Sequence, residues 1–504
     1  MERIPTLIGA AGVCLSCVAF TGERTVVEGF NPAFSPDGRR LAFQRLDGNV
    51  FKIGVVDVAG GAVEWVEDGP GNAAYPSWTP SGGLVYMAGH DVETAHEAWH
   101  GGSKNGYGLR LWENGRKRVL TSGRCRDYTP CVSPDGRKVY FTTTRGVTSE
   151  SRNFSKAAAS RIAELDIAGG GEPRILMDSP NGNNSGFVQP AISPDGATLV
   201  WGHLESFFGM WRIYGTRVGR FSRQDWCSVS PPGLSATAPR WHPGGRILCY
   251  TGFRKGDPGW GVWVQDVYSG KVKRLATGSN PCFSPDGSSI AYDRGGKVFV
   301  CRFAAEDLPD ESMPEPFDGD DKPETVLWTK EGVEKEMRIG APRDQFAFGT
   351  DKTVFVRIRV KLDGTDRLRQ LLIGDYAESD QGFQLFVKQR DVWFSTRNSG
   401  NRFIGVKSAD YSAPGEYVLT GIRTPKRLLV SVNGLATTMS TSSSPIWHNT
   451  PVVNCPGDLL PLDNFRRFIV GRGLRPGERI AKVEVGTGWP VNVPKTRRRE
   501  DLFK

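Results

Sequence analysis

Three of the six histidines lie in one short segment, which contains the most obvious candidates for chemistry. His90, His96 and His100 fall within residues 89–101. A short helix there would place His96 and His100 on one face, and imidazole nitrogens are good zinc ligands. The alternative is a polar surface insertion with solvated imidazoles. We favour this alternative because the segment interrupts a repeated strand pattern, and we therefore predict no cofactor.

Patterns that would indicate other catalytic chemistry are missing from the sequence. A hydrolase nucleophile would need Gly-x-Ser-x-Gly at a strand–turn–helix, and this pentapeptide does not occur. A jelly-roll glycosidase would need paired carboxylates, commonly as Glu-x-Asp-x-x-Glu on one strand, and this string is also missing. The nine cysteines have no regular spacing, so they predict neither a disulfide framework nor a zinc site. The sequence therefore favours a protein that is not an enzyme.

Composition favours β structure. The 504 residues include 62 Gly and 33 Pro, the two weakest helix formers, so turns must be frequent and long helices scarce. With 38% hydrophobic and 24% charged residues the chain has a globular profile. It is also too long for one compact core, so we expect at least two domains.

The net charge of +9 does not predict nucleic-acid binding, because the basic residues are spread over both halves of the chain. The exception is residues 304–326, which hold nine acidic residues and one lysine. We interpret this segment as an acidic linker. The basic cluster Lys495–Arg499 lies in a basic tail, residues 491–504, and we expect this cluster to be a solvated end rather than a nucleic-acid site.

The N-terminus predicts export. No charged residue lies between Arg3 and Glu23, a length that suits a signal-peptide apolar region and is short for a membrane span. The alternative is that the apolar residues form a strand of the domain that follows. We favour a signal peptide over residues 1–22, hence a periplasmic or secreted protein without a transmembrane span.

An eight-residue pattern, close to x-Pro-x-(Phe/Trp)-Ser-Pro-Asp-Gly, occurs six times. The copies begin at Asn31, Tyr75, Thr129, Gln189, Ala238 and Asn280. Pro presets the first central position of a turn, Asp tolerates the next, and Gly adopts the positive φ that releases the chain. In the fifth copy His242 replaces the usual Ser, and we expect it to serve the turn.

Each copy is followed by an alternating apolar strand, a third strand ending near a Gly turn, and a fourth strand. Four short strands in each copy, with successive copies 42 to 60 residues apart, are typical of propeller blades. Six copies predict a six-bladed β-propeller over residues 23–303. The sixth copy lacks a fourth strand, and residues 24–29 resemble one. We therefore predict that this segment completes the last blade and closes the ring.

This repeat resembles that of TolB-like β-propellers. The resemblance implies either protein binding at the propeller face, as in the Tol–Pal component, or a non-catalytic gate before a peptidase. Propeller-type pectic lyases of the same superfamily use a His-rich metal site in the channel. That comparison makes a metal-dependent polysaccharide lyase or hydrolase the alternative function, although the spacing of His90, His96 and His100 does not reproduce those ligands.

Residues 327–490 predict a β-sandwich (jelly roll), so the fold class is all-β. Along 354–360 the residues Val354, Val356, Ile358 and Val360 alternate with Phe355, Arg357 and Arg359. The order of strands and a Val-Asn-Gly hairpin near Asn433 resemble laminin-G-like, concanavalin-A-like domains. That resemblance implies ligand recognition, often of carbohydrate.

Two sets of residues are candidates for ligand binding. The first lies where the first strands of the blades converge at the mouth of the ring, and the second consists of aromatic side chains that could stack on a sugar or pack on a partner. The candidates are Asn31, Tyr75, Thr129, Gln189, Arg240, Asn280, Phe207, Trp211 and Trp393. We predict a non-enzymatic, exported binding protein or scaffold that recognises a protein or polysaccharide at the cell envelope.

Overall fold

The structure is a computed structural model. It describes residues 22–67, 71–89, 107–122, 125–145, 160–177, 186–204, 211–222, 225–231, 234–254, 256–304, 307–312, 322–340, 352–363, 370–374, 383–388, 391–397, 403–408, 414–424, 428–433, 435–437, 439–442, 467–493 and 499–503. The chain divides into two compact units. The first runs to Glu315 and resumes at Arg497, and the second spans Pro316–Thr496.

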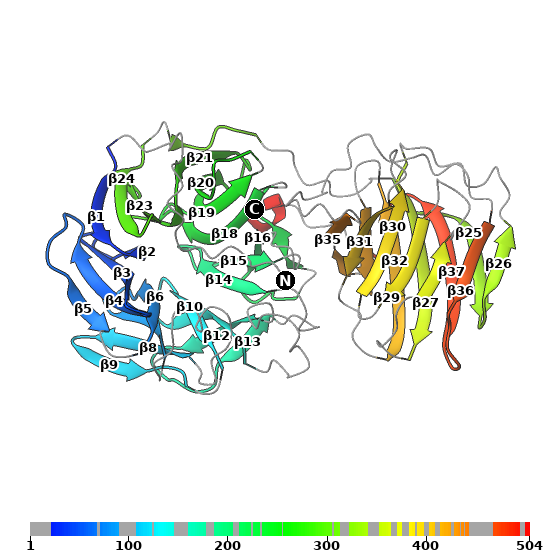
Figure 1. Cartoon of the computed structure of the whole chain (residues 1–504), viewed down its shortest axis with the longest axis horizontal. Helices are drawn as coiled ribbons and strands as arrows, with labels where there is room; N and C mark the ends of the chain where they lie inside the picture. Colours follow the sequence, from blue (N-terminus) through cyan, green and yellow to red (C-terminus); the bar gives the residue numbers. More distant parts are fainter. Residues whose placement is uncertain are drawn as a thin grey trace. The chain divides into compact units, whose positions relative to one another are not determined.

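Six four-stranded antiparallel sheets form the first unit over its described residues (Figure 1). Blade 1 contains β2 (Phe30–Phe34), β3 (Arg40–Asp47), β4 (Val50–Asp57) and β5 (Glu64–Glu67). Blade 2 contains β6 (Ala73–Trp78), β7 (Leu84–Gly89), β8 (Tyr107–Glu113) and β9 (Arg116–Val119). Blade 3 contains β10 (Asp127–Val132), β11 (Lys138–Thr143), β12 (Arg161–Asp166) and β13 (Arg174–Met177).

The remaining three sheets continue the same pattern. Blade 4 contains β14 (Phe187–Ile192), β15 (Thr198–Leu204), β16 (Trp211–Arg217) and β17 (Cys227–Ser228). Blade 5 contains β18 (Leu234–Trp241), β19 (Ile247–Arg254), β20 (Gly261–Asp266) and β21 (Val272–Thr277). Blade 6 contains β22 (Ser279–Phe283), β23 (Ser289–Arg294), β24 (Lys297–Arg302) and β1 (Arg24–Glu28). The predicted six-bladed propeller is confirmed.

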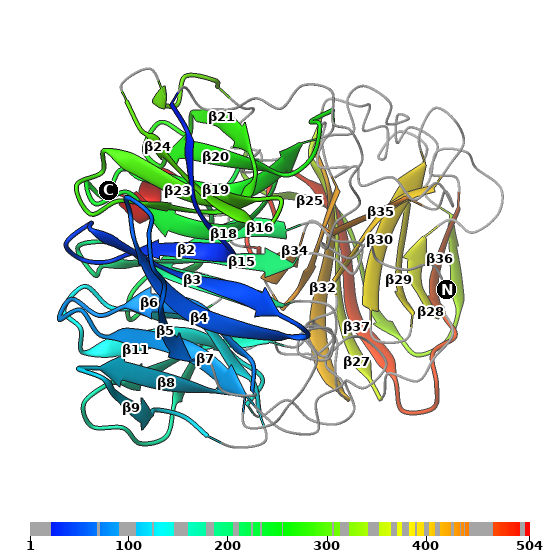
Figure 2. The same ribbon diagram turned by 60° about the vertical axis from the view of Figure 1, so that its left-hand side comes forward.

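The ring closes as the sequence predicts. Neighbouring first strands contact one another all the way round, and β2 of blade 1 meets β22 of blade 6. Strand β1 pairs antiparallel with β24, so the beginning of the described chain supplies the outer strand of the last blade (Figure 2). Glu23 holds this strand in place, because its carboxylate accepts hydrogen bonds from the Tyr292 hydroxyl and the Arg294 guanidinium.

The repeated turns follow the predicted chemistry. In blade 1 the Ser35 hydroxyl donates to Asp37 Oδ1 at 2.5 Å, and the same carboxylate accepts the Arg39 N–H at 3.1 Å. These hydrogen bonds lower the pKa of Asp37, because they stabilise the ionised form. In blade 5 the Gly244 N–H donates to His242 Nδ1 at 3.0 Å. His242 therefore serves its turn as predicted, and burial lowers its pKa.

The second unit is a β-sandwich of two antiparallel sheets. One sheet has the order β25 (Thr325–Val333), β37 (Arg479–Thr487), β27 (Val354–Leu362), β32 (Gly415–Arg423), β33 (Leu428–Val432) and β34 (Leu435–Thr437). The other has the order β26 (Met337–Gly340), β36 (Arg467–Arg472), β28 (Gln370–Gly374), β29 (Phe383–Lys388), β30 (Asp391–Arg397), β31 (Phe403–Ser408) and β35 (Met439–Ser442).

The alternation predicted for β27 sets the sandwich core. Val354, Val356, Ile358 and Val360 are buried in one cluster with the facing sheet. On the opposite face Phe355 is also buried, because Trp489 and Val493 pack over it. Strand β25 begins at Thr325, so the sandwich starts just inside the segment predicted as the acidic linker.

The solvated end predicted for Lys495–Arg499 is wrong for Arg499, which is 7% exposed, whereas residues 495–498 lie outside the described residues. The short helix α2 (Arg499–Phe503) packs on the propeller, next to β16 and β17 (Figure 1). Leu502 is 3% exposed within an apolar cluster shared by blades 4 and 5, and the Phe503 ring lies 5.9 Å from that of Trp241. The prediction considered only the charge of this segment. Its position is decided instead by the apolar contacts of Leu502 and Phe503 with the propeller.

Candidate functional site

The first residue of every repeat has an unusual backbone conformation. Asn31, Tyr75, Thr129, Gln189, Ala238 and Asn280 all have φ between 49° and 58°. Each precedes a proline, which disfavours the right-handed helical region, and each lies at a break in register between the first and second strands of its blade. The positive φ turns the amide N–H away from its own sheet, so that it can bond elsewhere.

Five of these amides bond across to the preceding blade. Asn31 N–H donates to Asp293 Oδ2 at 2.9 Å, Tyr75 N–H to Gln44 Oε1 at 3.0 Å and Asn280 N–H to Thr251 Oγ1 at 2.7 Å. Gln189 N–H donates to Thr142 Oγ1 at 3.2 Å, and Ala238 N–H donates to Gln189 Oε1 at 3.0 Å. We call these hydrogen bonds the inner girdle. They tie each of these blades to the one before it.

The acceptors occupy a recurring position that the sequence analysis missed. Gln44, Thr142, Thr251 and Asp293 each lie thirteen residues after the first residue of their own repeat. In blade 4 this position is Gly202, which has no side chain, and the Gln189 amide supplies the acceptor instead. A polar residue at this spacing within an apolar strand is a signal that could have revealed the girdle.

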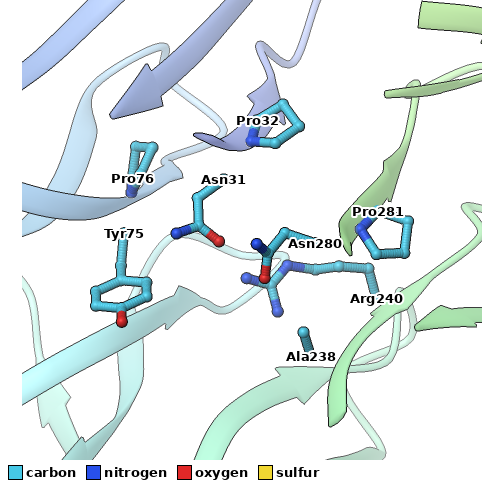
Figure 3. A pocket seen from close by; sticks show the side chains of 8 residues that line it. All are labelled: Asn31, Pro32, Tyr75, Pro76, Ala238, Arg240, Asn280 and Pro281. Carbon is cyan, nitrogen blue, oxygen red and sulfur yellow. The ribbon is translucent and has the colours of Figure 1, made fainter. Parts of the chain in front are cut away.

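A pocket lies at the centre of this ring (Figure 3). It is small and partly open to solvent, with room for about one water molecule. Its lining comes from blades 1, 2, 5 and 6, and consists of Asn31, Pro32, Tyr75, Pro76, Ala238, Arg240, Asn280 and Pro281. Figure 3 shows the Asn31 and Asn280 amides and the Arg240 guanidinium gathered at its centre, with the Tyr75 ring to one side.

Four of the predicted mouth residues thus line one pocket, namely Asn31, Tyr75, Arg240 and Asn280. The other two have side chains that serve the fold. Thr129 Oγ1 lies 2.6 Å from Thr142 Oγ1, and Gln189 Oε1 accepts from the Thr237 hydroxyl at 2.7 Å. The first bond lies within blade 3 and the second joins blade 4 to blade 5, and neither residue is among those that line the pocket.

The two aromatic candidates among the described residues, Trp211 and Trp393, do not line this pocket. Trp211 begins β16, where its backbone N–H donates to the Ser235 hydroxyl at 3.1 Å. Trp393 stacks on Phe386 with ring centroids 5.8 Å apart and an interplanar angle of 7°, so one face of its ring is covered. Phe207 lies outside the described residues, as do His90, His96 and His100.

Arg357 on the sandwich is held by ion pairs. Its guanidinium donates to Glu324 Oε1 at 2.7 Å and to Glu484 Oε2 at 2.6 Å. These two carboxylates raise the pKa of Arg357, although burial opposes them. The side chain therefore joins β27 to β37 and to the residue that precedes β25, and it is not an open ligand-binding group.

Asp293 holds two of the residues that line the pocket. Its Oδ2 accepts the Asn31 N–H at 2.9 Å and the Asn280 side-chain N–H at 2.8 Å. Burial raises the pKa of Asp293 to about 6, and the two hydrogen bonds oppose that shift. This carboxylate fixes the backbone of one pocket residue and the amide of another.

In the part of the chain that the structure describes, no three His, Cys, Asp or Glu side chains gather closely enough to hold a metal. Within the same ranges, no helix has the length and apolar character needed to cross a membrane.

No protein-family model matches this chain. Solved structures similar to it include TolB from Acinetobacter baumannii, with 18% identity, a TM-score of 0.38, and coverage of 58% of this chain and 65% of that one. A gluconolactonase from Xanthomonas campestris has 17% identity, a TM-score of 0.40, and coverage of 56% and 91%. An oligogalacturonate lyase from Vibrio parahaemolyticus has 12% identity, a TM-score of 0.37, and coverage of 58% and 97%. These similarities assign no activity to the chain.

Proposed function

We propose that this chain is a non-enzymatic binding protein that recognises a protein or glycan through the central pocket of its propeller. The observation that carries the proposal is the convergence of Asn31, Tyr75, Arg240 and Asn280 on one pocket. The inner girdle holds the backbone of three of these residues, so the polar side chains are presented by a rigid frame. A site built on rigid elements loses little conformational entropy when a ligand binds.

The proposal extends to the cell envelope. Its support is the apolar N-terminal segment, which has the length of a signal-peptide core. The sandwich would supply a second recognition surface, in keeping with its resemblance to laminin-G-like domains. Neither part is needed for the pocket to bind.

The metal-dependent lyase or hydrolase remains the alternative raised by His90, His96 and His100. No observation on the described residues favours it. Metal analysis of the purified protein discriminates between the two classes. A stoichiometric metal that is lost when these three histidines are replaced by alanine would favour the enzyme.

The binding proposal is tested with the full chain on a random peptide display library and on a glycan array. Arg240→Trp should fill the pocket and abolish binding. Arg246→Trp is the matched control, because Arg246 belongs to the same blade but does not line the pocket. Its side chain is 64% exposed, and its Nη2 lies 2.7 Å from Oδ2 of Asp266. Absence of any binder, or unchanged binding by a folded Arg240→Trp protein, would overturn the proposal.

Hydrogen exchange of the unmodified protein covers the case in which Arg240→Trp does not fold. Ligand binding should slow exchange at the amides around Asn31 and Asn280. Protection confined to the sandwich would overturn the pocket assignment and leave a binding protein with its site elsewhere.

A further inference from the structure

Arg240 departs from the repeat to which it belongs. It is the third residue of its copy, a position that is Ala33, Ser77, Cys131, Ala191 and Cys282 in the other five copies. Small side chains at this position suit a crowded axis where six blades converge. The propeller therefore does not require an arginine here, and blade 5 carries the one long cationic side chain at this level.

The surroundings of Arg240 come from several blades. Its charge opposes the effect of burial on three thiols, those of Cys131, Cys249 and Cys282, which belong to blades 3, 5 and 6. Burial nonetheless raises the pKa of all three, to about 12 for Cys282. The guanidinium thus lies near the axis of the ring, where it also lines the pocket.

The charge of Arg240 is not neutralised by the protein over the residues that the structure describes. Its printed hydrogen bond runs from Nη1 to the backbone oxygen of Pro239 at 2.9 Å, and no described carboxylate forms an ion pair with it. Asp293 bonds to Asn31 and Asn280 instead. None of the eight residues that line the pocket is acidic, so the one formal charge in its lining is that of Arg240.

We infer that this pocket takes the carboxylate of an acidic residue on a protein partner. The inference rests on the proposed function, because it names the partner chemistry of the same pocket. A planar guanidinium matches a carboxylate through paired N–H···O bonds, and the neighbouring Asn31 amide offers a further donor. Charge-assisted bonds of this kind are stronger than neutral ones, especially where water is restricted.

The dimensions and lining of the pocket favour a side chain over a sugar ring. The pocket is partly open to solvent and has room for about one water molecule, so the tip of a slender carboxylate side chain suits it better than a uronic acid ring. The lining also holds a single aromatic residue, Tyr75, which packs against the cluster of Phe51, Ala74, Met87 and Tyr107. Part of the Tyr75 ring is therefore already covered by protein, which leaves less of it for stacking on a sugar.

The test uses the full chain and peptides selected from a random display library at neutral pH. Peptides that bind should be enriched in Asp and Glu, and soluble N-acetylglutamate amide should compete with them. Arg240→Gln should weaken the selected peptides at least about tenfold, the loss expected for one charge-assisted contact. Arg240→Lys should recover part of the affinity, and Arg246→Gln should leave it unchanged.

The outcomes separate this inference from the proposed function. Enriched peptides without acidic residues, or acidic peptides that Arg240→Gln binds equally well, would overturn the carboxylate inference while the binding function stands. Binding of glucuronate or a polyuronate without any peptide would overturn the choice of a protein partner. No binding of peptides or glycans would contradict the proposed function itself. Thermal melting shows whether each variant folds, and competition by N-acetylglutamate amide on the unmodified protein needs no variant.

Discussion

The backbone N–H of Asn31 donates to Oδ2 of Asp293 at 2.9 Å, although 262 positions separate the two residues. This bond joins the first blade to the last at the centre of the ring, while β1 joins the same ends at the rim. Ring closure therefore has an inner and an outer component. The inner one also shapes the pocket, because Asp293 holds the Asn280 amide as well.

Asp293 should make stability depend on pH in the opposite sense to most carboxylates. Its native pKa of about 6 lies above the ordinary 3.8, so the folded protein binds this proton more tightly than the unfolded chain. The contribution is complete below about pH 4 and is lost as pH rises through 6. Asp293→Asn keeps an acceptor without the charge and should gain about 1–3 kcal/mol relative to the unmodified protein at pH 7.

Urea unfolding between pH 4 and pH 7 measures this effect, and Asp57→Asn on an exposed residue is the control. An identical pH slope in the Asp293→Asn and unmodified proteins would show that the carboxylate is not held as described.

Loss of Glu23 should loosen the rim of blade 6. Its carboxylate accepts from Tyr292 and Arg294, and the Glu23 side chain is 15% exposed. Glu23→Ala leaves the partly buried Arg294 without this carboxylate and should cost about 1–3 kcal/mol. Hydrogen exchange should accelerate first at the amides of β1 and β24. Acceleration spread evenly over all blades would argue against a local latch.

Gln189→Leu should weaken the joint between blades 4 and 5. The Gln189 amide replaces the side chain that Gly202 lacks, accepting from the Ala238 N–H and the Thr237 hydroxyl. Leucine keeps the volume but leaves both donors without this acceptor, at a cost of about 1–3 kcal/mol. Chemical denaturation measures the loss, and Lys297→Ala at an exposed position should have little effect. A stable Gln189→Leu protein would contradict the girdle's role.

Leu502→Ala should destabilise the propeller rather than the sandwich. Leu502 is 3% exposed and packs in the cluster of blades 4 and 5, so the truncation should cost about 2–5 kcal/mol. Val491→Ala is the matched control, because that side chain is 81% exposed. Faster exchange at β16 and β18 reports the effect. If those strands are unchanged while sandwich strands accelerate, α2 does not belong where it is placed.

The sequence predicted what local chemistry determines. The Pro-x-Gly turns and apolar strands gave the blades, the missing fourth strand of the last copy gave the closure by β1, and the alternation along β27 gave the sandwich core. These features depend on residues close together in the chain, where turn residues and strand periodicity are informative.

The parts that the sequence did not predict depend on contacts between distant residues. Asp293 looked like a polar residue in an apolar strand, and only its bond to Asn31 shows its role. The alternation along β27 predicts that Arg357 faces away from the core, and only the fold places Glu324 and Glu484 beside it. Likewise, the six mouth candidates were equivalent by spacing, and only the fold separates the four that line the pocket from Thr129 and Gln189.

The most direct test of the account is hydrogen exchange of the unmodified full-length protein with and without a selected acidic peptide. We predict slower exchange at the amides around Asn31, Arg240 and Asn280, with little change in the outer strands of the blades. Protection confined to the sandwich or to the outer strands, with these central amides unaffected, would contradict the claim that the propeller's central pocket is the binding site.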